Sequence, residues 1–217
     1  MTEDDFNHTI ANALKHRCLS VNQIKKVVTE MQGTIYETTA ATMAIPLLYA
    51  HWEGFVRETL TSYIKFIEAQ NIPPLTTNPT IFAFSLRRQL RSLSGKQTVE
   101  RTTEFARTAL NMLSKPIQFS DKTIDTKSNL RFEVLEDLCA TLCINVNRLK
   151  ESKRDINALV NRRNNIAHGD RLQKIYLDDV EEYVVLIFKI LNDFETILNE
   201  SVSRKTFCQP ALLRVKY

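Results

Sequence analysis

The sequence is poor in the residues that make turns. Its 217 residues include only 4 glycines and 6 prolines. A many-stranded sheet needs frequent turns, and turns use these two residues heavily. The apolar fraction of 43% and the charged fraction of 25% are ordinary for a folded globular protein. We therefore expect an all-α, single-domain helical bundle over residues 1–200, followed by a C-terminal tail at 201–217.

The sequence also lacks long apolar runs. No stretch approaches the roughly 20 uncharged apolar residues that a membrane span requires. The chain begins with an acidic segment that contains Glu3, Asp4 and Asp5, whereas a signal peptide begins with basic residues. We expect a cytoplasmic protein with no membrane partner.

Cysteine pairs of the kind that hold metals are missing. The four cysteines, Cys18, Cys139, Cys143 and Cys208, form no C-x-x-C motif. The spacing of Cys139 and Cys143 fits two small buried residues on one helix face. No cluster of Asp, Glu, His or Cys has the spacing of metal ligands. We expect neither a cofactor nor a metal.

The formal net charge of +4 permits a polyanionic partner without demanding one. The densest basic run consists of Arg87, Arg88, Arg91, Lys96, Arg101 and Arg107. Glu100 and Glu104 are interspersed, so a solvated helix face is one interpretation. A path for an RNA backbone is the other.

Apolar residues that recur every three or four positions predict amphipathic helices. These are expected at 6–31, 45–67, 81–93, 98–113, 129–144, 156–167 and 177–198. Pro46 should kink the second helix or lie in its first turn, and Gly169 should end the sixth. The segments 71–80 and 114–128 are expected to be connections.

The search for catalytic groups is short because the sequence has only four histidines. His8 and His16 are interpreted as surface or packing residues of the first helix. His168 instead ends a helix that carries Arg163 and Asn164. Arg163 continues the apolar stripe of that helix and should face the core side. A charge on that face needs a partner or a functional cleft, since unpaired burial is costly.

The segment Arg163-Asn164-Asn165-Ile166-Ala167-His168-Gly169 resembles the R-x4-6-H motif of the HEPN superfamily, including the polar residue after the arginine. The segment 47–56 is similar to the early helix of MAE-type HEPN-like nucleases. The segment Ser128-Asn129-Leu130, which stands before the helix that precedes the motif, is also similar to these nucleases. Together the matches span roughly positions 40–185.

The resemblance implies a helical bundle that acts as a metal-independent endoribonuclease. Its expected catalytic residues are Arg163, His168, Asn164 and Glu53. In such a reaction the 2′-hydroxyl of RNA attacks the adjacent phosphorus. A histidine transfers protons near neutral pH, and an arginine grips phosphate oxygens with paired donors. The expected products carry a 2′,3′-cyclic phosphate and a 5′-hydroxyl.

One motif supplies one imidazole, although the chemistry needs both an acid and a base. A two-fold homodimer built on the helix from Ile156 to His168 would bring two motifs around one cleft. The expected partners are therefore RNA and a second copy of the chain.

Glu53 is the second position of interest, because Tyr49, Trp52 and Val56 share its helical stripe. We expect it to pair with an arginine. In the functional interpretation Glu53 pairs with Arg163 or orients His168, and a structural ion pair with another arginine is the alternative. His51 and Trp52 are interpreted as packing residues.

Three functions remain open from the sequence. The first is a toxin-like or antiphage-defence ribonuclease, with an antitoxin or another defence-system protein as a further possible partner. The second is a catalytically inactive HEPN module that binds nucleic acid or a protein. The third is a helical interaction protein in which Arg163 and His168 are incidental.

Overall fold

The computed structural model describes residues 1–93, 98–119, 122–169 and 174–209. Within these ranges the chain forms eight α-helices and two short 3-10 helices, and its only extended pairing is a single bridge between Thr77 and Cys208. The predicted all-α fold is confirmed. No described helix combines the length and the apolar character that crossing a bilayer would take.

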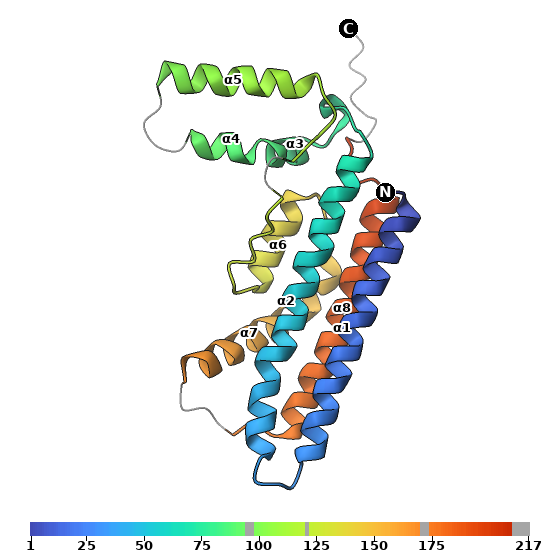
Figure 1. Cartoon of the computed structure of the whole chain (residues 1–217), viewed down its shortest axis with the longest axis vertical. Helices are drawn as coiled ribbons and strands as arrows, with labels where there is room; N and C mark the ends of the chain where they lie inside the picture. The colour runs from blue at the N-terminus through green and yellow to red at the C-terminus, as the bar shows by residue number, and fades with distance from the viewer. Residues whose placement is uncertain (94–97, 120–121, 170–173, 210–217) are drawn as a thin grey trace.

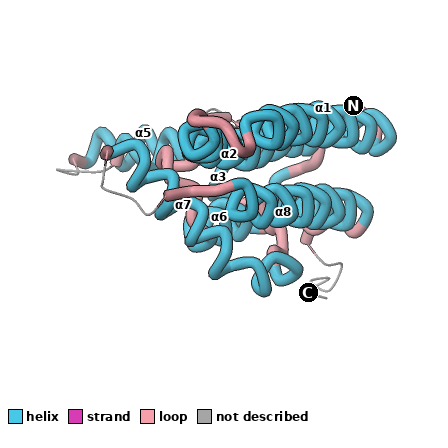
Figure 2. Tube along the Cα trace, turned by 90° about the horizontal axis from the view of Figure 1, so that it is seen from below, coloured by secondary structure: helices cyan, strands magenta, loops and turns pink. Residues whose placement is uncertain are grey.

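Three long helices form the body of the molecule: α1 (Glu3–Met31), α2 (Glu37–Ala69) and α8 (Leu177–Ser203). All three pack against one another, as Figure 1 shows. In the view of Figure 2, α1 and α2 make one layer. The second layer contains α8 together with α6 (Phe132–Thr141) and α7 (Lys153–His168).

Local signals in the sequence explain where α1 begins. Thr2 accepts a hydrogen bond from the Asp5 amide at 3.1 Å, and the Asp5 carboxylate accepts one from the Thr2 amide at 2.7 Å. This capping box satisfies two amides that the first turn leaves unpaired. Beyond it the apolar seam is buried as its spacing predicts, at Phe6, Ile10, Val21 and Val28.

α2 is longer than its sequence pattern predicted. It begins at Glu37, so Pro46 lies inside the helix, and its placement in the first turn is wrong. The additional turns contain Ala41 and Ala44, which are buried although their small side chains contribute little to an apolar stripe. The following stripe is fully buried and includes Trp52 and Phe55, whose rings both lie edge-on to Phe194 of α8.

The helix predicted at 81–93 is two helices, α3 (Pro79–Ser85) and α4 (Arg87–Ser92). The break lies at Leu86, whose φ of −87° and ψ of 2° interrupt the helix. Phe84 and Leu86 are both buried, with 7% of each exposed. Residues two apart point to nearly opposite sides of a continuous helix, so the break allows both side chains to be buried.

α5 (Val99–Leu113) lies at the same end of the molecule as α3 and α4 (Figure 1). It contains no buried residue among those described. Lys96, which belongs to the predicted basic run, lies outside the described residues. The described residues of the connection after α5, 114–119 and 122–131, form no helix, as predicted for 114–128, and residues 117 and 119 are hydrogen-bonded at the end of α2. Its Ile117 amide donates to the Ile72 carbonyl at 2.9 Å, and its Phe119 amide donates to the Glu68 carboxylate at 2.9 Å.

Cys143 departs from the predicted helix face. α6 ends at Thr141, and Cys143 lies beyond it with a φ of 58°. Cys139 is fully buried, and burial raises the pKa of its thiol. Cys143 is half-buried.

The segment after α8 packs onto the core. Residues 201–209 were assigned to a tail, yet α8 continues to Ser203 and Phe207 is buried. The Phe207 ring lies 6.2 Å from Tyr63 and 5.9 Å from Phe66, edge-on to both. Residues 210–217 lie outside the described part of the chain.

We expect Phe207→Ala to destabilise the protein by about 3–5 kcal/mol, because it opens a cavity against two aromatic rings. Urea unfolding followed by circular dichroism measures this change. Leu75→Ala is the matched control, since Leu75 is 74% exposed and its truncation should change stability by less than about 0.5 kcal/mol. Equal effects of the two substitutions would contradict the packing of this segment.

Candidate active site

The motif lies on α7, which the structure places where the sequence predicted a helix. Ile156, Leu159 and Val160 are buried, and this face packs α7 against α2. Gly169 ends the helix with a φ of 73°, a left-handed conformation that glycine adopts without strain. Figure 1 shows the C-terminal half of α7 extending away from the long helices. The first half of α7 is therefore anchored to the body of the molecule, and the motif residues lie on its second half.

Arg163 faces the core side of α7, as predicted, and is half-buried. Its guanidinium lies over the Tyr49 ring of α2, 4.9 Å from the ring centroid. Nη1 donates to the Asn164 side-chain oxygen at 2.9 Å and to the Ser128 carbonyl at 3.5 Å. The stacked ring and the two acceptors fix the position of the positive charge.

Asn164 links Arg163 by hydrogen bonds to the segment that precedes α6. Its side-chain nitrogen donates to the Asn129 side-chain oxygen at 3.2 Å, while its oxygen accepts the bond from Arg163. Asn164 therefore orients the arginine beside it. It shares a helix face with His168, because the two residues are four positions apart.

Tyr49 connects the arginine to the interior of the site. Its hydroxyl accepts a hydrogen bond from the buried Leu130 amide at 2.7 Å. Burial raises the pKa of Tyr49 above its ordinary value. The Glu53 carboxylate raises this pKa further, whereas the Leu130 amide and the Arg163 charge oppose the increase. The phenol therefore stays protonated at neutral pH and can donate to Glu53.

The predicted ion pair between Glu53 and an arginine is wrong. Glu53 is half-buried and accepts a hydrogen bond from the Thr126 hydroxyl. No ion pair of Glu53 occurs among the described residues. Tyr49 lies one helical turn before Glu53, so its ring lies beneath the guanidinium, while the Thr126 hydroxyl donates to the carboxylate.

This arrangement leaves the charge of Arg163 uncompensated. Within the described ranges, no carboxylate lies within ion-pair distance of its guanidinium. The neighbouring Arg162 differs, because it lies 3.8 Å from Asp179 at the start of α8. Arg162 therefore holds α7 to α8, whereas Arg163 presents a positioned cation without an anionic partner.

His168 occupies the last position of α7 and is exposed. The described residues offer no hydrogen bond or ion pair to its imidazole. The structure thus brings Arg163 and Asn164 into contact and places Glu53 behind Tyr49. It leaves His168 at the open end of the same helix, where a ligand or a second chain can reach it.

The other histidines lie elsewhere. His8 and His16 are exposed on α1, and Trp52 is fully buried, as expected for a packing residue. His51 is half-buried, and its pKa is lowered by burial and, to a lesser extent, by the charges of Arg17 and His16. In the part of the chain that the structure covers, no group of three or more His, Cys, Asp or Glu residues could hold a metal ion.

Sequence reasoning missed the residues that hold the motif in place. Tyr49 was assigned to the apolar stripe around Glu53 and, like Ser128 and Asn129, to a family resemblance. Thr126 had no role at all. An available signal was the spacing of Tyr49 and Glu53, which places a phenol and a carboxylate on adjacent turns of one helix face.

Tyr49→Phe is expected to lower the free energy of unfolding by about 1–3 kcal/mol. The change leaves the buried Leu130 amide without its acceptor, while the ring beneath Arg163 remains. Chemical unfolding measures the loss, and Tyr36→Phe is the control because Tyr36 is 61% exposed. An unchanged stability would contradict the role assigned to the phenol.

Comparison with known proteins identifies the family. The family model described as RiboL-PSP-HEPN matches residues 12–200, which cover the helical body and the motif. No curated protein and no solved structure matched the chain. The match confirms the predicted relationship at the level of the superfamily. The chain therefore belongs to the RiboL-PSP-HEPN family of the HEPN superfamily.

Proposed function

We propose that this protein is a metal-independent endoribonuclease whose catalytic residues are Arg163 and His168, positioned by Asn164. Membership of the HEPN superfamily supports a nuclease or an RNA-binding module in general. The observation that carries the narrower proposal is the state of Arg163. It is half-buried, held by Tyr49 and Asn164, and has no carboxylate partner among the described residues. Such a group is preorganised to bind an anion.

The anion in this reaction is the phosphodiester. The 2′-oxygen forms a bond to phosphorus as its proton passes to one imidazole, and negative charge develops on the non-bridging oxygens. The Arg163 guanidinium, already stripped of part of its hydration, stabilises that charge with paired donors. The bond from phosphorus to the 5′-oxygen then breaks, and a second imidazole, in its protonated form, gives a proton to the leaving oxygen.

Two imidazoles are needed, and one chain supplies one suitable residue. We assign the second to another copy of the chain, with the two α7 helices paired across a two-fold axis. The exposed position of His168 at the outer end of α7 is compatible with such a composite site. Glu53 acts in this arrangement as a positioning residue, because it is linked to Arg163 through Tyr49.

The biological role that fits this activity is a cytoplasmic toxin or antiphage-defence effector, restrained by an antitoxin or another defence protein. Uncontrolled RNA cleavage would harm the cell that makes the enzyme. A catalytically inactive HEPN module that binds RNA or a protein is the second candidate. It is favoured because the hydrogen bonds of Arg163 among the described residues go to Ser128 and Asn164 and none goes to His168.

Purified protein incubated with total cellular RNA in excess chelator should cleave it and leave 2′,3′-cyclic phosphate and 5′-hydroxyl ends. The product ends are identified by their resistance to ligation and by mass spectrometry. Light scattering in parallel should give the mass of a dimer. Cleavage that stops when chelator is added, or that leaves 3′-hydroxyl ends, would overturn the mechanism. Binding of RNA without cleavage would favour the inactive module.

A further inference from the structure

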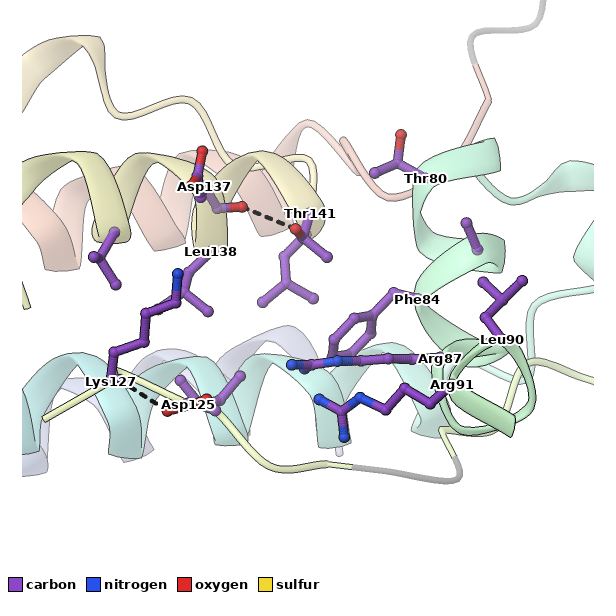
Figure 3. A pocket seen from close by; sticks show the side chains of 14 residues that line it. Thr80, Phe84, Arg87, Leu90, Arg91, Asp125, Lys127, Asp137, Leu138 and Thr141 are labelled. Atoms are coloured by element: carbon purple, nitrogen blue, oxygen red, sulfur yellow. Dashed lines mark hydrogen bonds between the residues drawn. The ribbon is translucent and has the colours of Figure 1, made fainter. Parts of the chain in front are cut away.

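A pocket lies between α3, α4 and α6, next to the segment that leads to the motif. It has a volume of about 650 Å³ and is lined by α3, α4, α6 and the segment 124–127 (Figure 3). This volume falls within the usual range for small-molecule sites. The proposed reaction assigns no role to this pocket.

The pocket joins an apolar surface to a set of positive charges. Phe84 and Leu142 are buried in its wall, and Val134 and Leu138 are half-buried there. The Arg87 guanidinium lies 5.6 Å from the centroid of the Phe84 ring.

In Figure 3 the side chains of Arg87 and Arg91 extend from α4 across the pocket, and Lys127 stands on the opposite side. Neither Arg87 nor Lys127 forms an ion pair within the described part of the chain. Two carboxylates, those of Asp125 and Asp137, also line the pocket. The wall thus offers apolar contact, cations and hydrogen-bond acceptors within one enclosure.

We propose that this pocket binds a nucleotide. The apolar side chains and the guanidinium that covers Phe84 provide a surface on which a planar base can stack. The two cations without ion-pair partners suit its phosphate, and the two carboxylates can accept hydrogen bonds from the amino groups of a base. An apolar ligand without charge would leave Arg87 and Lys127 unused, and a bare phosphate would leave the apolar wall exposed.

The pocket is connected to the motif by one short stretch of chain, 124–130. Ile124, Asp125 and Lys127 line the pocket. The residues between and after them bind the candidate active site: Thr126 donates to Glu53, Ser128 accepts from Arg163, Asn129 accepts from Asn164 and Leu130 donates to Tyr49.

Backbone strain at two residues of this stretch is a further link between the pocket and the motif. Lys127 and Ser128 have φ values of 54° and 49°, a left-handed conformation that costs energy for residues other than glycine. A ligand that contacts Lys127 therefore acts on the backbone that positions Arg163. This inference rests on the proposed function. The nucleotide is either part of the RNA substrate or a free nucleotide whose binding affects the same active site.

The test compares Arg87→Ala with Arg88→Ala, two adjacent changes that remove the same charge. Arg88 is exposed on α4 and does not line the pocket. The full chain carrying His168→Ala is titrated into a short fluorescein-labelled single-stranded RNA, and anisotropy gives the Kd. We expect Arg87→Ala to weaken binding about tenfold and Arg88→Ala to weaken it by less than about twofold.

A third variant separates the pocket from general attraction to the phosphate backbone. Leu90 lines the pocket and is 45% exposed, so Leu90→Arg should fold. The added charge would tighten non-specific binding, but the larger side chain fills the pocket, so we expect weaker binding. Equal effects of the Arg87 and Arg88 substitutions, or tighter binding by Leu90→Arg, would overturn the proposal.

Competition with AMP, GMP, CMP and UMP identifies the source of the nucleotide. Displacement of the RNA by a mononucleotide supports a site for free nucleotides, and its absence alongside the expected variant effects supports a site for a nucleotide within a strand. The two proposals fail separately. If the protein has no RNase activity but the variants bind RNA as expected, the nucleotide-binding proposal is supported and the RNase proposal is not. If the protein is an active RNase but the Arg87 and Arg88 substitutions weaken RNA binding equally, the RNase proposal is supported and the nucleotide-binding proposal is not.

Discussion

Replacing His168 with alanine is expected to slow RNA cleavage by about 10²–10⁴-fold, the range that a lost general acid or base usually costs. The residue is exposed at the last position of α7 and has no described partner, so the fold should not depend on it. In a composite site the substitution removes the imidazole from both chains. The loss should therefore be as large in single-turnover reactions as in steady state.

His8→Ala is the matched control, because His8 is also exposed on a helix and lies on α1, away from the motif. Cleavage rates of the three proteins are compared at equal concentration, with thermal unfolding to show that each is folded. Full activity of His168→Ala would falsify the assignment of the proton-transfer group. An equal loss in His8→Ala would point to an effect outside the motif.

Arg163→Ala is expected to lower cleavage by about 10²–10³-fold, because it removes the charge that stabilises the phosphorane. Arg163→Lys should recover only part of this loss. It restores the charge but not the planar fork of donors, nor the flat group that stacks on Tyr49. Arg163→Ala should also cost about 0.5–1 kcal/mol of stability through the lost contact with the ring.

The neighbouring arginine provides the comparison. Arg162 is half-buried and lies near Asp179 of α8, so Arg162→Lys should change stability more than cleavage. Rates are measured at saturating RNA to separate binding from chemistry. If Arg163→Ala reduced activity only in proportion to the fraction of unfolded protein, its role would be structural.

The sequence was a good guide to the helices and to the side of α7 on which Arg163 lies. Both follow from periodicity, which is a property of the chain itself. Ile156, Leu159 and Val160 define the buried face of α7, and Arg163 extends the same stripe. The sequence was a poorer guide to boundaries. The beginning of α2 is built from small residues, and the break at Leu86 depends on burying two side chains that one helix could not turn to the same side.

The partner of Glu53 is a feature that helical periodicity could not predict. The pattern indicated correctly that this carboxylate lies on a buried stripe and needs a partner. It could not supply the identity of that partner, because Thr126 comes from a stretch without helical spacing. The Tyr49 phenol lies one turn away on the same helix face, and the Glu53 carboxylate contributes to its raised pKa.

The sequence by itself therefore determined the helical class, the family motif, and the helix and face on which the motif lies. All of these depend on residues close together in the chain. The tertiary structure alone decided that Arg163 keeps its charge without a carboxylate partner among the described residues. It also decided that the stretch 124–130 holds the motif while lining the pocket between α3, α4 and α6. The physical reason is that α2, α7 and this stretch meet only when the chain folds, and hydrogen bonds between distant residues leave no periodic trace in the sequence.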